Sequence, residues 1–132
     1  MPLRAIRGAT QLDADERDHL LERVIELVRA VLVRNQLTPG DVVSILFTAT
    51  QDLRSEFPAS AARALGISEV PLLCAQELDV VGALPRVVRL LAHVETPRSA
   101  GDIRHVYLHG ARNLRTDLSH DDWPESDEGS RS

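Results

Sequence analysis

The residues Val42-Val-Ser-Ile-Leu-Phe-Thr-Ala49 are a nearly continuous apolar run of the length of one β-strand, and the rest of the predicted fold is arranged around this strand. A run of this kind is typical of a strand that is buried on both faces of a sheet. The segment before it, Leu37-Thr-Pro-Gly-Asp41, contains the proline and glycine that end a preceding element. Residues 42–49 are therefore predicted to form a strand that is buried on both faces.

A long amphipathic helix is predicted before this strand, from Asp13 to about Asn35. Asp13 has the side chain of a helix N-cap, and Glu16, three positions later, completes a variant of the capping box. Five apolar residues then recur at helical spacing and form one stripe: Leu20, Val24, Leu27, Val28 and Val31. Such a helix covers one face of a sheet.

Further strands and a short helix are predicted around these two elements. The strands are residues 3–10, 70–76, 86–96 and 104–108. The short helix begins at Pro58 and closes at Gly66. Periodicity alone would allow the segment 86–96 to be a buried helix, but its β-branched residues and the prolines that flank it favour a strand. The order of elements predicts an α/β or α+β domain, with a mixed five-stranded sheet and helices on one face. The other face must then be buried by oligomerisation.

The composition narrows the possible chemistry. All fifteen basic residues are arginine, so the chain has no lysine for a Schiff base or a P-loop. Its 132 residues, 43% of them apolar, suit one domain. No apolar run approaches the length of a membrane span and no leader opens the chain, so a cytoplasmic protein is expected. The one cysteine, Cys74, suits a small buried hydrophobe, and the histidines do not lie at ligand spacing with it, so no metal site is predicted.

The net charge of −5 lies entirely near the C-terminus. Residues 1–115 carry fourteen arginines and fourteen carboxylates, whereas residues 116–132 carry six carboxylates and one arginine. A body that is neutral overall gives no reason to expect a nucleic-acid partner. We predict one folded domain over residues 1–118, and an acidic tail over residues 119–132 that is too polar to order itself.

Several polar residues stand inside the apolar strands, and each has two explanations. Arg7 and Arg89 either bind a ligand or pair with Glu77 or Asp79 in structural ion pairs. Tyr107 suits a core tyrosine whose hydroxyl group meets a carbonyl group as well as it suits a binding site. The chain has none of the motifs G-x-S-x-G, G-x-G-x-x-G and H-E-x-x-H. The residue types alone leave both explanations open.

Six short motifs stand in order along the chain. They are Ile6-Arg-Gly-Ala-Thr10, Ala49-Thr-x-Asp-Leu53, Phe57-Pro-Ala59 with Arg63, Val70-Pro71, Cys74-x-Gln-Glu-x-Asp79 with Gly82 and Arg89, and Ile103-Arg-His-Val-Tyr-Leu108 ending in Leu114-Arg115. Together, at this spacing, they resemble the small monofunctional bacterial chorismate mutases of the trimeric α/β class. The resemblance covers about residues 3–118. One departure is Ser60, which stands where the family often has a lysine.

The resemblance implies a trimer that packs into a pseudo-α/β-barrel, with three active sites at the subunit interfaces. The implied reaction is the Claisen rearrangement of chorismate to prephenate, on the route to phenylalanine and tyrosine. This unimolecular step needs no nucleophile, metal or cofactor. It needs the substrate held in a reactive conformation and the charge on the breaking ether oxygen stabilised.

The resemblance also assigns the site residues. Arg89 and Glu77 would be catalytic, with Arg89 donating to the ether oxygen and Glu77 accepting from the ring hydroxyl group. Arg7 and Tyr107 would hold a substrate carboxylate. The other substrate-binding residues it implies are Leu73, Cys74, Ala75 and Gln76 of the same subunit, Phe57, Ala59 and Arg63 of a neighbouring subunit, and Leu114 and Arg115 at the mouth of the site.

Two other functions are compatible with the sequence. A non-catalytic trimer of similar shape would bind small metabolites in the same clefts. An interaction protein would act through the acidic tail. The six motifs favour the enzyme.

Overall fold

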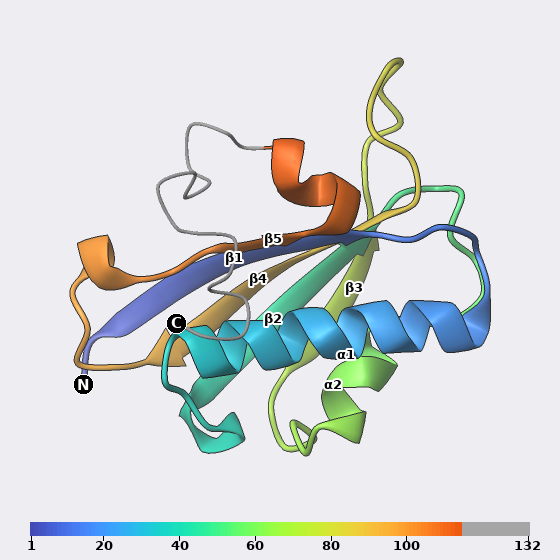
Figure 1. Cartoon of the computed structure of the whole chain (residues 1–132). Coiled ribbons are helices and arrows are strands. Elements are labelled where there is room, and N and C mark those ends of the chain that lie inside the picture. Colours follow the sequence, from blue (N-terminus) through green and yellow to red (C-terminus); the bar gives the residue numbers. More distant parts are fainter. Residues whose placement is uncertain (115–132) are drawn as a thin grey trace.

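The computed structural model describes residues 1–114, which form a five-stranded sheet with two α-helices packed against it (Figure 1). The strands are β1 (Leu3–Gln11), β2 (Val42–Ala49), β3 (Leu72–Gln76), β4 (Val87–Glu95) and β5 (Val106–Leu108), in the order β3-β2-β4-β1-β5. β4 runs antiparallel to both β1 and β2, whereas β3 is parallel to β2 and β5 is parallel to β1. The predicted mixed sheet is confirmed, and the ambiguous segment 86–96 is a strand.

The two α-helices lie on one face of the sheet, as predicted. They are α1 (Arg17–Arg34) and α2 (Ala59–Ala64), and three short 3₁₀ helices complete the described chain: η1 (Pro39–Asp41), η2 (Ala100–Asp102) and η3 (His109–Asn113). All five residues of the predicted apolar stripe of α1 are at most 3% exposed. They pack against alternate side chains of the strands, among them Ile6, Phe47 and Leu90, to make one core.

Gly8 of β1 lets α1 approach the sheet closely. A Cβ atom at this position would lie 3.2 Å from Cδ1 of Leu27 and 3.3 Å from Cδ1 of Leu90. Contacts this short would require the side chains of Leu27 and Leu90 to shift, so the absence of a side chain at Gly8 lets Leu27 of α1 pack closely on the sheet.

The start of α1 differs from the prediction. The helix begins at Arg17, and its N-cap is Glu16, which has a φ of −141° and no side-chain capping hydrogen bond. Asp13 is not a cap; its Oδ2 atom accepts a hydrogen bond of 3.0 Å from Nη2 of Arg23. Because Asp13 lies too far before the first turn to reach its amides, an ion pair with the second turn replaces the predicted cap.

The second face of the sheet is not covered by helices within residues 1–114. In β2, Ile45 and Phe47 are buried beneath the helices, but Leu46 and Thr48, which point the other way, are only half-buried. The two-sided burial expected for residues 42–49 is therefore not met within one chain. We call this second surface the open face. It is formed by the outward side chains of β1, β2 and β4: Ala5, Arg7, Ala9, Leu46, Thr48, Arg89, Leu91 and His93.

The predictions about a membrane span and a metal site concern the whole chain, of which the structure describes residues 1–114. Within residues 1–114, no helix is long and apolar enough to cross a membrane. The same part of the chain holds no group of three His, Cys, Asp or Glu side chains that could bind a metal ion. The tail predicted at residues 119–132, and the end of the predicted domain at residue 118, lie outside the described residues.

Candidate active site

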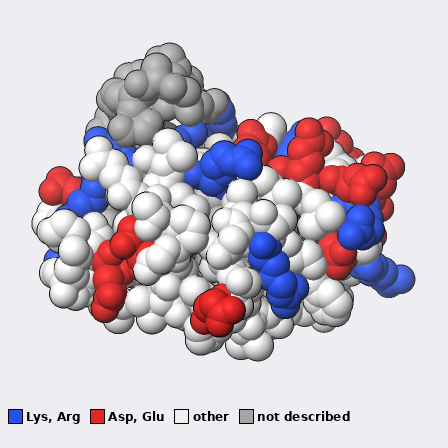
Figure 2. Space-filling view, turned by 90° about the horizontal axis from the view of Figure 1, so that it is seen from below, with Lys and Arg blue, Asp and Glu red and all other residues white. Residues whose placement is uncertain are grey.

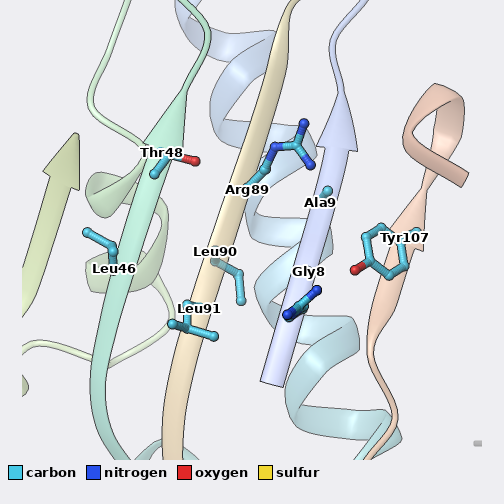
Figure 3. Close-up of a pocket in the computed structure, with 9 residues that line it drawn as sticks. Gly8, Ala9, Leu46, Thr48, Arg89, Leu90, Leu91 and Tyr107 are labelled. Atoms are coloured by element: carbon cyan, nitrogen blue, oxygen red, sulfur yellow. The ribbon is translucent and has the colours of Figure 1, made fainter. Parts of the chain in front are cut away.

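A pocket of about 280 Å³ lies on the open face, where three polar side chains of the predicted site meet. The register of the sheet places Ala9 of β1 between Arg89 of β4 and Tyr107 of β5 (Figure 3). Because the alanine side chain is small, a hollow remains between its two larger neighbours. Arg7, two residues before Ala9 on the same strand, points to the same side. The pocket is lined by Arg7, Gly8, Ala9, Leu46, Thr48, Arg89, Leu90, Leu91 and Tyr107.

Arg89 is oriented by Glu77, the residue that directly follows β3. The Nε atom of Arg89 donates a hydrogen bond of 2.9 Å to Oε2 of Glu77, and the hydroxyl group of Thr48 donates one of 2.7 Å to the same oxygen. Thr48 and Arg89 are partners in the register of β2 and β4. Within residues 1–114, no hydrogen bond engages the two terminal nitrogens of Arg89. The ion pair thus fixes the guanidinium plane and leaves two donor groups for a ligand in the pocket.

Most of the remaining predicted residues lie on β3 and around α2, outside this pocket. A second hollow, of about 240 Å³, has Phe57, Cys74, Ala75 and Gln76 in its lining. Phe57 is 68% exposed and Leu73 is 65% exposed, which is unusual for side chains of this size. The structure therefore brings three predicted residues together in the first pocket and four in the second hollow, whereas Leu73, Ala59, Arg63 and Leu114 line neither.

Two of the predicted residues are turned towards the core. Cys74 is the register partner of Phe47 and packs against the core, so its side chain lies on the helix side of β3. Any contact of Cys74 with the pocket of Arg89 must come from its backbone. Ala59, at the start of α2, is 4% exposed.

The last three predicted residues lie elsewhere. Arg63 of α2 is exposed, and Leu114 follows η3 as its C-cap. Arg115 lies outside the described residues.

Two carboxylates hold the loop of residues 50–57, which ends in the exposed Phe57. The oxygens of Asp15 accept hydrogen bonds from the backbone amides of residues 54 and 55, at 3.0 and 3.1 Å. Glu56 accepts from the amide of Phe57 at 2.8 Å and from Nε of Arg17 at 3.1 Å. These contacts tie the loop to the start of α1 and so set the direction in which Phe57 projects.

Hydrogen bonding lowers the pKa of both carboxyl groups. Burial raises the pKa of Asp15, but the amides of residues 54 and 55 and the charge of Arg54 outweigh burial and leave it below its ordinary value. The pKa of Glu56 is lowered chiefly by the amide of Phe57, against the opposing effect of burial and with help from Arg17 and Ser60. Both groups therefore hold the loop in their charged forms.

The family model described as chorismate mutase type I matches residues 3–118. The chain belongs to the type I chorismate mutase family. It is 42% identical over 120 residues to chorismate mutase AroH of Bacillus subtilis (strain 168), which is 90% of this chain and 94% of that protein. It is also 42% identical over 117 residues to chorismate mutase AroH of Thermus thermophilus, or 88% of this chain and 96% of that one.

A solved chorismate mutase has a similar structure. The chorismate mutase from Clostridium thermocellum, Cth-682, superposes with a TM-score of 0.80 and is 41% identical in sequence. The match covers 81% of this chain and 96% of that one. The fold and the enzyme class predicted from the six motifs are thereby confirmed, and a non-catalytic binding protein is not favoured.

We expect this chorismate mutase to lose stability in acid through Asp15 and Glu56. A carboxyl group whose pKa is lower in the folded state stabilises the fold above its unfolded pKa, near 4, and this stabilisation is lost as the pH falls through the folded pKa. Chemical denaturation at several pH values from 7 to 3 should show the loss. In Asp15→Asn, which keeps one acceptor oxygen but cannot titrate, the acid limb should be shallower. An acid limb identical to that of the wild type would exclude Asp15 as a cause.

Six residues that line the pocket were not predicted as site residues: Gly8, Ala9, Leu46, Thr48, Leu90 and Leu91. The sequence offers a reason to single out Thr48, because it is a polar residue near the end of the apolar run 42–49. It offers no such reason for Ala9 and Leu91. Their part in the pocket depends on the pairing of β1 with β4, which brings together residues that are far apart in the sequence.

Proposed function

We propose that this member of the family converts chorismate to prephenate, a step towards phenylalanine and tyrosine, in the pocket on the open face. The observation that carries the proposal is the placement of Arg89, whose Nε is bound by Glu77 while its terminal nitrogens remain for a ligand beside Arg7 and Tyr107. The names of the relatives support the same reaction class.

In the reaction, one σ bond breaks and one σ bond forms within the same molecule. The carbon–oxygen bond between the ring and the enolpyruvyl side chain breaks, while a carbon–carbon bond forms between the methylene carbon of that side chain and the ring carbon that bears the carboxylate. The ether oxygen becomes a ketone oxygen and gains negative charge on the way. Arg89 donates to this oxygen more strongly as the charge grows, which is preferential binding of the transition state.

The other polar groups hold the substrate in the conformation that reacts. Arg7 and Tyr107 flank Ala9 and bind the carboxylate of the side chain, with the arginine as a planar two-pronged donor. Glu77 accepts from the ring hydroxyl group through Oε1, because its Oε2 atom is already bonded to Thr48 and Arg89. Positioning of this kind is a large part of what an enzyme contributes to a unimolecular rearrangement. No cofactor is needed.

The active form is a homotrimer with its sites between subunits. Two observations support this. The open face, with Leu46 and Leu91 half-buried around the pocket, is not covered by a helix of residues 1–114. Phe57 and Arg63 of the same chain do not line the pocket. A neighbouring subunit that presents Phe57 and Arg63 would close the pocket and add a third cation, besides Arg7 and Arg89, for the dianionic substrate. The three sheets would then form the core of a pseudo-α/β-barrel.

We also propose a cytoplasmic enzyme that binds no nucleic acid, with its catalytic domain ending near residue 118. On the face drawn in Figure 2, arginines and carboxylates are interleaved and no broad basic surface forms. Nucleic-acid binding needs a basic stripe or patch, which the balanced charges of residues 1–115 do not suggest.

Incubation of the purified chain with chorismate tests the function directly. We expect the ultraviolet absorbance of chorismate to fall far faster than in buffer, and prephenate to be the product identified by mass spectrometry. Addition of a chelator should leave the rate unchanged, because the rearrangement uses no metal ion. A rate equal to that in buffer would overturn the proposal.

A further inference from the structure

Asp52, in the loop after β2, binds the chain at the start of β4. Its Oδ2 and Oδ1 atoms lie 3.0 and 3.2 Å from the backbone amide nitrogen of Arg86, which donates to them. Oδ1 also accepts a hydrogen bond of 2.5 Å from the hydroxyl group of Thr50. The oxygen of that hydroxyl group in turn accepts from the amide of Val87 at 3.0 Å. Two consecutive amides at the start of β4 are thus held from the same short loop.

The backbone at Arg86 needs this support. Its φ is +54°, in the left-handed region that is unfavourable for residues with a side chain. The carbonyl group of Arg86 accepts from the amide of Leu12 at 2.8 Å, and its Nε donates to the carbonyl group of Leu12 at 3.0 Å. These contacts leave the amide of Arg86 to Asp52, which completes the set of bonds that keep this conformation.

The connection from β3 to β4 has few packed side chains. The side chain of Gln11 also binds it, by donating a hydrogen bond of 3.0 Å from Nε2 to the carbonyl group of Pro85. In the connection itself, Leu78 is 87% exposed, Val80 is 60% exposed and Val81 is 100% exposed. A segment with so few packed side chains does not by itself fix the point at which the next strand begins. Within residues 1–114, the bonds of Asp52 and Thr50 are the side-chain contacts to the backbone amides of residues 86 and 87.

Arg89 lies two residues after Val87, on the same face of β4. In an extended strand two residues span about 6.6 Å with little freedom, so the position of Val87 sets the position of Arg89. The register partners Thr48 and Arg89 bring Nε of Arg89 to 2.9 Å from Glu77. A shift of the strand would break this ion pair, and a slip by one residue would turn Arg89 to the other face.

We propose that Asp52 is a positioning residue for Arg89: it fixes the start of β4 through the amide of Arg86, and thereby the place of the guanidinium group in the pocket. The consequence for turnover rests on the proposed function, since it assumes that Arg89 acts on chorismate. The placement of Arg89 by Asp52 does not depend on that assumption.

The test is a graded series at position 52 with a matched control at the other end of β2. Asp52→Ala should lower kcat by about 10- to 100-fold and change KM far less, because a misplaced group costs mainly the transition state. Asp52→Asn keeps an acceptor oxygen, so it should recover most of this loss. The control is Asp41→Ala, since Asp41 likewise accepts from an amide and a hydroxyl group, both of Thr38, at 2.8 and 3.2 Å. It should keep the kcat of the wild type.

A second readout does not require turnover. The NMR signal of the Nε–H group of Arg89 reports its hydrogen bond to Glu77, and it should move in Asp52→Ala, move less in Asp52→Asn and stay in place in Asp41→Ala. Should Asp52→Ala fail to fold, the shift of this signal in Asp52→Asn decides the question. An unmoved signal, or a kcat in both position-52 variants equal to that of Asp41→Ala, would overturn the proposal. A wild type without turnover would instead overturn the proposed function, while the signal of Arg89 would still test the role of Asp52.

Discussion

Replacement of Arg89 by alanine is expected to lower kcat by about 100-fold or more, as removal of a donor to a developing oxyanion does in other enzymes. In the mechanism that we propose, the guanidinium group is the donor that follows the ether oxygen as its bond breaks, so the loss should fall on kcat more than on KM. The fold should persist, because the Arg89 side chain is 39% exposed and lies outside the core. Steady-state kinetics with chorismate measures the effect, and circular dichroism during heating checks the fold.

Two further variants separate the chemistry of Arg89 from its charge. Arg89→Lys keeps the charge but loses the planar group that binds Glu77 through Nε, so it should remain far less active than the wild type. Arg29→Ala removes an exposed arginine of α1 and should leave kcat unchanged. If Arg89→Ala turned chorismate over as fast as Arg29→Ala does, Arg89 would have no part in the chemical step.

An element of the fold could be predicted from the sequence wherever its residue pattern is compatible with only one type of secondary structure. The apolar stripe of α1 can be buried in only one way, and all five predicted residues lie in the core. The segment 86–96 was settled by its β-branched residues and flanking prolines, against an ambiguous periodicity. The start of α1 was not predictable in this way. Asp13 has the chemistry of a cap, and only the three-dimensional structure shows that Arg23 binds it instead.

Three of the polar residues that line the pocket could be predicted from the sequence. Some of the contacts that hold them in position could not. Arg7, Arg89 and Tyr107 are conspicuous because they are polar residues in apolar strands, and the structure places them around one pocket. The ion pair between Arg89 and Glu77 shows that the two explanations for such residues are compatible, since the same contact is structural and orients a donor. The bond from Asp52 to the amide of Arg86 joins residues 34 positions apart, and no local pattern reveals it.

Combining Arg63→Ala with Arg89→Ala in one trimer should raise the activity above that of either variant alone if the sites lie between subunits. Arg63→Ala should lower kcat/KM by about 10-fold or more, because a cation facing the dianionic substrate is lost, and Arg89→Ala is almost inactive by the argument above. In the trimer that we propose, Arg89 comes from one subunit and Arg63 from the next. A site is then intact wherever an Arg63→Ala subunit supplies Arg89 and an Arg89→Ala subunit supplies Arg63. In every trimer that contains both variants, about one site in three is then intact, whichever variant is present twice.

The matched control combines two variants whose altered residues belong to the same subunit in each site. Arg7 and Arg89 line one pocket within one chain, so in a mixture of Arg7→Ala and Arg89→Ala every site lacks one of the two arginines. This mixture should stay inactive. The variants are co-expressed with two different affinity tags, and mixed trimers are purified through both before kinetics with chorismate. Recovery in the first mixture but not in the second is the result that requires a site shared between neighbours. Mixed trimers of the first pair that are no more active than the better of their parents would show that Arg63 does not act across the interface.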